Sequence, residues 1–142
     1  MRFLAATIAF FVLTSGLAAE PVPVGKVRVL DGDTVAISIR LLGFDTPETS
    51  KLRAKCDKEI ELGKRAATRL REILATGKPT VELAPCSCPE NTQGTERCNF
   101  GRACGRLFVN GKDVGEMLIA EGHARPYDFK WDARPPAADW CS

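Results

Sequence analysis

A helical repeat of apolar positions predicts one long α-helix, from about Lys58 to Ala75. Apolar residues return there every three or four positions and charged residues fill the opposite face. This is the pattern of a helix that packs against a core on one side. Gly77 follows as a stop signal, and Pro79 cannot continue the helix. The helix is the element that the sequence predicts most clearly.

Short runs of strand-forming residues flank this helix. They lie at residues 27–30, 34–42, 80–83 and 106–109. We expect the second run to fold back on itself near Ile37-Ser38, although neither Gly nor Asn marks a turn there. The last run leads into a tight turn at Asn110-Gly111. The pattern therefore predicts three strands before the helix and two after it.

The segment after this turn predicts a second, short helix. Asp113 and Glu116 have the Asp-x-x-Glu spacing of a capping box, and Gly122 closes the apolar stretch that follows. Residues 85–99 and the tail that contains Pro126 show no periodicity and are expected to be irregular. The order of elements is that of a small barrel. We predict an α+β, mostly β fold: a five-stranded OB-fold barrel with one long and one or two short helices.

The first nineteen residues follow a different pattern. Arg2 precedes an apolar run, residues 3–17, and small residues end it, which is the order of a secretory signal peptide. The run of about 15 residues is shorter than the roughly 20 that a membrane-spanning helix needs. We therefore expect a signal peptide at residues 1–19, one domain at residues 20–142, no stable membrane anchor, and a secreted or periplasmic monomer.

The six cysteines all lie after this segment, at positions 56, 86, 88, 98, 104 and 141. An even number after an export signal is typical of disulfides formed in an oxidising compartment. A zinc site is the alternative, because Cys86-x-Cys88 followed by Cys98 and Cys104 could supply four thiolates. No Cys-x-x-Cys spacing favours zinc, so we expect three disulfides. The sequence does not choose among their pairings.

The charge balance excludes a protein that coats nucleic acid through bulk positive charge. The formal net charge is +2, and removal of Arg2 with the signal peptide lowers it to about +1. A function in nucleic-acid binding must therefore depend on a local site.

Charged residues in one apolar segment suggest such a site. Asp33, Asp45 and Glu48 supply carboxylate oxygens, which suit a hard cation such as Ca²⁺. Arg40 lies among apolar residues, where a guanidinium needs an anionic partner. A cation and an arginine can take up charge that develops on a phosphodiester, while a carboxylate orients or deprotonates water. The combination favours phosphodiester hydrolysis.

Each piece alone also has a structural explanation. Asp33 follows Asp31-Gly32 and could be a turn residue. Thr46-Pro47-Glu48 could simply begin a helix. Arg40 could pair with a structural carboxylate, and Gly101-Arg102 alone carries no signal. Only the set, taken in this order, points to catalysis.

The strings DGDT, RLLGFDTPE, FGR and NGKDV, at these spacings, closely resemble the thermonuclease family, the staphylococcal-nuclease-like proteins. The resemblance spans about Val27 to Tyr127, and Arg102 stands nine residues before Gly111, as in the family pattern. It implies an OB-fold and a calcium-dependent endonuclease. The implied substrates are DNA and RNA, and the implied products carry 3′-phosphates and 5′-hydroxyls.

The resemblance also implies a metal site. It assigns Ca²⁺ to the carboxylates of Asp33 and Asp45 and to the main-chain carbonyl of Thr46. His123, the single histidine, stands where the family pattern has no catalytic residue. We expect it to be structural or exposed.

The catalytic side chains implied by the resemblance are Arg40, Glu48 and Arg102. The two arginines would clamp the phosphate, since only a guanidinium offers a planar fork. Glu48 would act on the attacking water as general base or orienter. Arg106 lies close to Arg102, and choosing it instead would require a four-residue shift of register.

The sequence departs from the family pattern in three places. The stretch between Asp33 and Arg40 is shorter, so we expect a tight join between the second and third strands. The loop before Arg102 is longer and rich in cysteine. The tail contains proline where a helix is usual, which leaves Tyr127 and Phe129 as the candidates for base-stacking aromatics.

Two other classes of protein fit part of the sequence. One is a catalytically inactive OB-fold module that binds nucleic acid or protein; such a module has no reason to keep all five charged residues of the predicted site. The other is a disulfide-stapled inhibitor or adhesion domain, which leaves the carboxylates unexplained.

Overall fold

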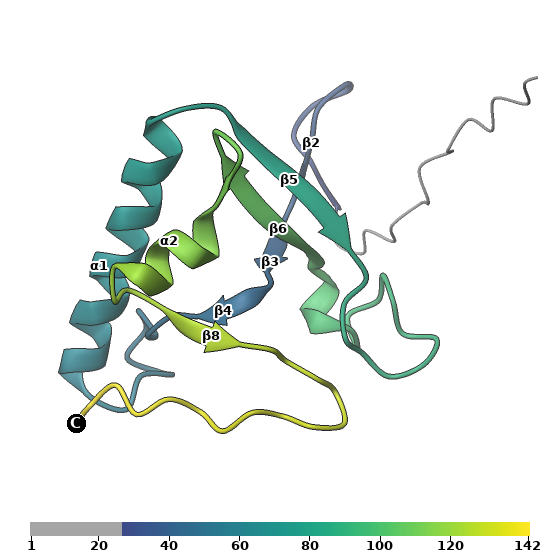
Figure 1. Cartoon of the computed structure of the whole chain (residues 1–142). Coiled ribbons are helices and arrows are strands. Elements are labelled where there is room, and N and C mark those ends of the chain that lie inside the picture. The colour runs from purple at the N-terminus through teal and green to yellow at the C-terminus, as the bar shows by residue number, and fades with distance from the viewer. Residues whose placement is uncertain (1–26) are drawn as a thin grey trace, which may run out of the picture.

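The structure, a computed structural model, describes residues 27–142, so the predicted signal peptide lies outside the described residues. The elements, in chain order, are β1 (Val27–Val29), β2 (Val35–Ile37), β3 (Ile39–Leu41), β4 (Gly43–Asp45), α1 (Asp57–Ala75), β5 (Pro79–Ala84), the single turn η1 (Asn99–Gly101), β6 (Ala103–Val109), β7 (Lys112–Asp113), α2 (Val114–Ala120) and β8 (Arg125–Tyr127) (Figure 1). The α+β class with one long helix and one short α-helix is confirmed.

The strands of the described part form three separate sheets. In the largest, β6 lies between β3 and β5 and also pairs with β7. The pairing of β3 with β6 is parallel, and that of β5 with β6 is antiparallel. Two further antiparallel pairs are β1 with β2 and β4 with β8. The parallel pair places the segment after Ser38 beside the segment after Arg102.

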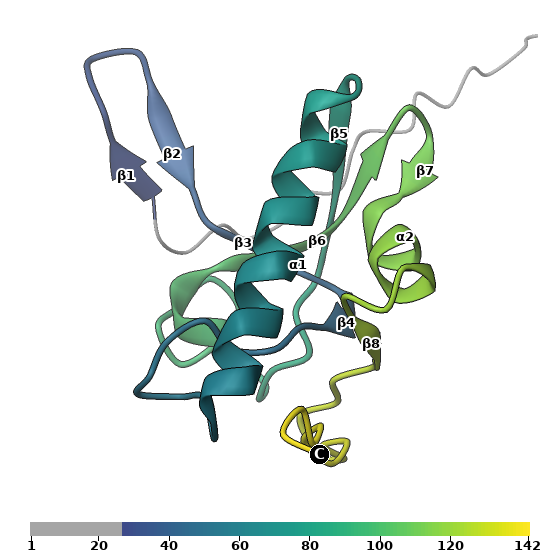
Figure 2. The same ribbon diagram turned by 90° about the vertical axis from the view of Figure 1, so that its left-hand side faces the viewer.

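The chain does not fold back at Ser38 as expected. It changes direction there, and β3 leaves β2 to pair with β6, while the Ser38 carbonyl accepts a hydrogen bond from the Ala103 N–H at 3.0 Å. Without Gly or Asn at this position, the chain has no residue suited to a tight hairpin turn. Figure 2 shows the result: the β1–β2 hairpin projects away from the rest of the domain.

The tail is more regular than predicted. Arg125–Tyr127 forms β8 and pairs with β4, with Pro126 opposite Phe44. Proline is tolerated because this pair is a two-stranded ribbon, in which each strand has a free edge. β6 also begins three residues earlier than the predicted strand, at Ala103.

The core lies where α1, α2 and β6 meet. Its buried side chains are Ile73, Val109, Val114, Leu118 and Ala124. The apolar face of α1 therefore packs as its periodicity predicted.

The predicted signals at both ends of α2 are confirmed. The Asp113 carboxylate accepts a hydrogen bond from the Glu116 N–H at 3.0 Å, as in a capping box. Gly122 follows the helix with φ of 76°, a conformation that favours glycine.

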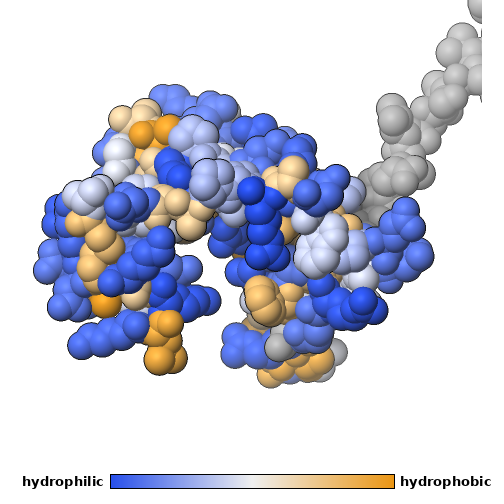
Figure 3. Space-filling view, turned by 90° about the horizontal axis from the view of Figure 1, so that it is seen from below, coloured by the Kyte–Doolittle hydropathy of each residue, from blue (hydrophilic) through white to orange (hydrophobic). Residues whose placement is uncertain are grey.

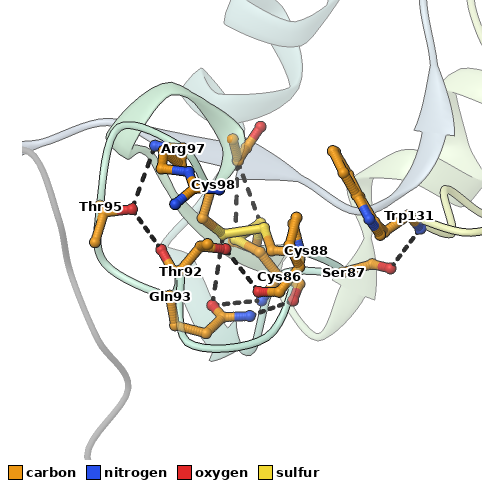
Figure 4. The surroundings of a disulfide bond; sticks show 12 residues. Cys86, Ser87, Cys88, Thr92, Gln93, Thr95, Arg97, Cys98 and Trp131 are labelled. Atoms are coloured by element: carbon orange, nitrogen blue, oxygen red, sulfur yellow. Dashed lines mark hydrogen bonds between the residues drawn. A yellow bond between two sulfur atoms is a disulfide. The ribbon is translucent and has the colours of Figure 1, made fainter.

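Three disulfides join the six cysteines: Cys56–Cys141, Cys86–Cys104 and Cys88–Cys98. The expectation of three disulfides is confirmed, and the zinc alternative is excluded because no cysteine of the described part has a free thiol. Two of the disulfides close the loop between β5 and β6, and Figure 4 shows the surroundings of one of them. The third ties the tail to the start of α1. None of the helices in residues 27–142 combines the length and the apolar character needed to cross a membrane.

Candidate active site

Arg40 and Arg102 approach each other because β3 and β6 run side by side in parallel. Arg40 is opposite Cys104 in this pairing, and Arg102 comes just before β6 begins. Both arginines line the same two cavities, one of about 760 Å³, which we call the main groove, and one of about 260 Å³. Figure 3 shows how deeply the surface is hollowed on one side of the molecule, with apolar and polar residues at the rims. The two guanidiniums that the sequence predicted to act together therefore share one site.

The guanidinium of Arg102 is oriented by Asn99. Its Nε donates to the Asn99 carbonyl at 3.1 Å and its Nη2 donates to the Asn99 side-chain oxygen at 2.8 Å. Burial and the neighbouring charges of Arg40 and Arg53 lower the pKa of Arg102 below its ordinary value. Burial and neighbouring cations destabilise the charged form of this guanidinium, so an anion that binds beside it stabilises it. This arrangement suits a phosphate.

The alternative arginine, Arg106, has other partners. Its Nε and Nη2 lie 2.9 Å and 2.8 Å from an Asp113 carboxylate oxygen, and Glu116 is 3.6 Å away. Arg106 lines neither of the two cavities. The geometry thus favours Arg102 over Arg106 as the phosphate ligand.

Asp45 is the anionic partner that Arg40 was expected to need. Its Oδ1 lies 3.3 Å from Nη2 of Arg40, and both side chains are partly exposed. Asp45 ends β4, and Thr46 follows it directly, so the carboxylate and the Thr46 carbonyl come from adjacent residues. Both residues line the smaller cavity together with Arg40 and Arg102.

Glu48 lies on the main groove with Arg40 and Arg102. One of its carboxylate oxygens is 3.0 Å from Nε of Arg53. Arg53 therefore directs the Glu48 side chain and also adds to the positive charge that Arg102 experiences. This role was not predictable from the sequence, because Arg53 stands in a basic stretch that is typical of a solvated loop.

The backbone around Glu48 is fixed by α1. Glu59, 6% exposed, accepts hydrogen bonds from the Glu48 N–H at 3.3 Å and from the Lys55 N–H at 2.7 Å. At Gly63 a Cβ atom would lie 2.6 Å from the Pro47 carbonyl oxygen and 2.7 Å from that of Glu48. Because real Cβ atoms do not approach so closely, only glycine lets this loop lie against the helix. Sequence reasoning missed Glu59, which looked like one more charged residue of the helix.

Asp33 is the predicted site residue that the structure leaves apart. It lies in the exposed turn between β1 and β2, where its carboxylate accepts a hydrogen bond from the Thr34 hydroxyl at 3.0 Å. Figures 1 and 2 both show this hairpin extending away from β4. The structure therefore brings together Arg40, Asp45, Thr46, Glu48 and Arg102, and does not place Asp33 among them.

The donor atoms are of the type that calcium binds, but the structure does not bring all of them to one place. Asp45 and Thr46 offer the oxygen ligands that a hard cation takes. Within residues 27–142, however, no three carboxylates come within 4.8 Å of one another. In the described part of the chain, the only such cluster of metal-binding residue types is Cys86, Cys88 and Cys98, whose sulfurs are all in disulfides.

A family model for staphylococcal nuclease homologues matches residues 38–139. The match covers most of the chain, including both arginines, Asp45, Thr46 and Glu48. The chain belongs to the staphylococcal nuclease family. Membership confirms the predicted OB-fold class, and Asp33 lies just outside the matched residues.

Three other proteins are similar to this chain in sequence. The SPbeta prophage-derived endonuclease YokF of Bacillus subtilis (strain 168) is 34% identical over 113 residues, which are 75% of this chain and 34% of the relative. Endonuclease YncB of the same strain is 33% identical over 105 residues, 69% of this chain and 44% of the relative. The succinoglycan biosynthesis protein ExoI of Rhizobium meliloti (strain 1021) is 32% identical over 130 residues, 87% of this chain and 62% of the relative. The chain thus spans less than two thirds of the length of each.

Proposed function

We propose that this protein is an endonuclease that hydrolyses the phosphodiester bonds of DNA and RNA, leaving 3′-phosphates and 5′-hydroxyls. The observation that carries the proposal is the joint presence of Arg40, Arg102 and Glu48 on one groove. Two relatives that are named endonucleases support it. An inactive binding module would not need a carboxylate beside two guanidiniums.

The chemistry follows from what each side chain offers. Arg40 and Arg102 donate hydrogen bonds to the non-bridging oxygens of the phosphate and take up the negative charge that grows there in the transition state. Asn99 occupies one edge of Arg102 and leaves the other edge for the substrate. Glu48 orients the attacking water and accepts its proton, because a guanidinium is unsuited to act as a base at neutral pH.

Calcium dependence is part of the proposal. Asp45 and the Thr46 carbonyl would hold the ion, with Asp33 as the further ligand that the family resemblance assigns. A bound Ca²⁺ would supply charge stabilisation at the phosphate. Since the structure does not place Asp33 beside Asp45, we assign no geometry to this site.

The test uses the full oxidised protein with plasmid DNA and with RNA. We expect cleavage in Ca²⁺ and none in excess EGTA. Glu48→Gln should remove activity without changing the melting temperature by more than a few degrees. Absence of cleavage of either nucleic acid in Ca²⁺ would refute the nuclease, whereas cleavage that persists in EGTA would refute only the calcium dependence.

We also propose that residues 1–19 are a signal peptide and that the protein is exported. Its three disulfides support an oxidising compartment, because cytosolic proteins keep thiols reduced. Intact mass measured with and without reduction, on protein produced with the full sequence, should show loss of the first eighteen or nineteen residues and a gain of six hydrogen atoms on reduction. A full-length mass would contradict the cleavage.

A further inference from the structure

The main groove extends well beyond the residues proposed to act on the phosphate. Its volume of about 760 Å³ lies in the range of pockets that hold a whole small ligand, about 300–1,000 Å³, so a phosphate alone would not fill it. One wall is the cysteine-rich loop between β5 and β6, and the other is the tail after β8. Something larger than the scissile group therefore fits there.

Aromatic residues gather on this groove. Five of the seven aromatic residues between positions 27 and 142 line it, namely Phe44, Phe100, Tyr127, Phe129 and Trp131. Phe100 is 76% exposed and Trp131 is 50% exposed. Two large rings exposed on one groove form an apolar surface of the kind that marks a binding site, and their flat faces suit a ligand with flat apolar groups.

Cationic groups accompany these rings. Arg134 lies over two of them, 5.5 Å from the ring centre of Phe129 and 6.0 Å from that of Trp131. Five cationic and three acidic side chains line the groove, and one of the acids, Asp128, is paired with Lys130 at 3.1 Å. A groove that offers both rings and an excess of positive charges matches the bases and phosphates of a single nucleic-acid strand.

The tail that carries Trp131 is anchored at two points. Its backbone N–H donates to the Ser87 hydroxyl at 2.9 Å, and Ser87 lies between two disulfide-bonded cysteines (Figure 4). The Cys56–Cys141 disulfide fixes the end of the same tail. The backbone at Trp131 is therefore anchored where its side chain lines the groove, so less of this segment has to be ordered when a ligand binds.

We infer that Trp131 and Arg134 form a distal subsite that stacks an unpaired base of the strand being cut, away from the phosphate bound by Arg40 and Arg102. The inference rests on the proposed function for the identity of the strand, but its geometry is independent of the catalytic residues. An unpaired base is required because a base inside a duplex has no free face to stack. The subsite thus favours single-stranded over double-stranded nucleic acid.

The two tryptophans of the chain provide a direct test, because Trp140 does not line the groove. Trp140→Phe leaves Trp131 as the only tryptophan, and Trp131→Phe leaves Trp140. Both variants are titrated in EGTA with a single-stranded oligothymidylate that carries fluorescein, so that anisotropy reports binding and tryptophan emission reports stacking. We expect emission to be quenched on binding only in Trp140→Phe, and a blunt duplex to quench neither variant.

The contribution of the ring to affinity is measured with Trp131→Ala, which should bind the single strand at least about fivefold more weakly, the lower limit for loss of one stacked base. Trp140→Ala is the matched control. Binding without quenching of Trp131, equal quenching by the duplex, or unchanged affinity of Trp131→Ala would each overturn the subsite. Cleavage of nucleic acid in Ca²⁺ is scored separately, so failure of the nuclease proposal and failure of the subsite give different results.

Discussion

The loop that carries Glu48 and the loop that precedes Arg102 are both irregular, yet different interactions hold them. The Glu48 loop lies against α1 through a close backbone approach at Gly63 and hydrogen bonds to the buried Glu59 carboxylate. The other loop is closed by two disulfides, and Asn99 orients the guanidinium at its end. The contacts at Gly63 and Glu59 are not themselves crosslinks, although the Cys56–Cys141 disulfide lies beside them at the start of α1, whereas the second loop depends on two disulfides of its own. Different substitutions should therefore disrupt the two sides of the site.

The largest effect is expected from removing the guanidinium on the disulfide side. Arg102→Ala should lower kcat/KM for nucleic-acid cleavage by about 100- to 1,000-fold, the usual loss when a donor to a developing oxyanion is removed. Arg106→Ala is the control of the same type and should change kcat/KM by no more than a few fold, because Arg106 pairs with Asp113 instead. A severe loss in Arg106→Ala alone would reverse the assignment of the two arginines.

Loss of the disulfide next to Arg102 should come next. In the double variant Cys86→Ser, Cys104→Ser, the free energy of unfolding measured by denaturant titration should be about 2–5 kcal/mol lower. Its kcat should also be lower at temperatures where it is folded. The pair Cys56→Ser, Cys141→Ser removes the disulfide at the start of α1 and serves as comparison. We expect it to destabilise the fold but to leave kcat close to that of wild type. An unchanged kcat in Cys86→Ser, Cys104→Ser would mean that the loop needs no crosslink to position Arg102, and equal losses of kcat in the two double variants would mean that the effect is not specific to the disulfide beside Arg102.

The sequence predicted those parts of the fold that local pattern controls. The helix over residues 57–75 and the capped helix after Asp113 depend on periodicity and on end signals, which lie within a few residues of each other. β8 was missed because Pro126 suggests an irregular chain, and its pairing with β4 is a contact between residues far apart in sequence. The turn at Ser38 was misjudged for the same reason, since the partner of β3 is β6.

The candidate site was predictable to the extent that its residues share a motif. Arg40, Asp45, Glu48 and Arg102 are recognisable from residue type and spacing, and the structure brings them together. Residue type does not reveal which neighbours support a site. Glu59 is one acidic residue among several in α1, and only the path of the loop at Glu48 and Lys55 explains its burial. Motif spacing likewise gave no indication that Asp33 would lie on a separate hairpin.

On the α1 side, the strongest perturbation is Gly63→Ala. The new methyl group would meet the carbonyl oxygens of Pro47 and Glu48, so the loop must shift outward. We expect a loss of about 1–3 kcal/mol in the free energy of unfolding and at least a tenfold fall in kcat. Ala67→Gly is the control, because it changes the glycine content of the same helix without introducing a steric clash. A Gly63→Ala protein with normal kcat would show that Glu48 does not depend on this approach.

The smallest effect is expected for Glu59→Gln, which keeps the size of the side chain and removes one of its two acceptor oxygens. One of the two N–H groups, at Glu48 or at Lys55, then faces an amide NH₂ and loses its partner, at a cost of about 1–3 kcal/mol. Because the Glu48 backbone loosens while the groove keeps its arginines, kcat should fall several fold with KM nearly unchanged. Glu61→Gln is the matched control, because the Glu61 side chain is exposed. Its ion pair with Arg65, at 3.8 Å, lies on the surface and contributes little to stability. The difference in the free energy of unfolding between Glu59→Gln and Glu61→Gln should be the same with and without the Cys86→Ser, Cys104→Ser pair if the two supports are independent. A difference that changes when the Cys86–Cys104 disulfide is removed would mean that the α1 side and the disulfide side of the site are coupled.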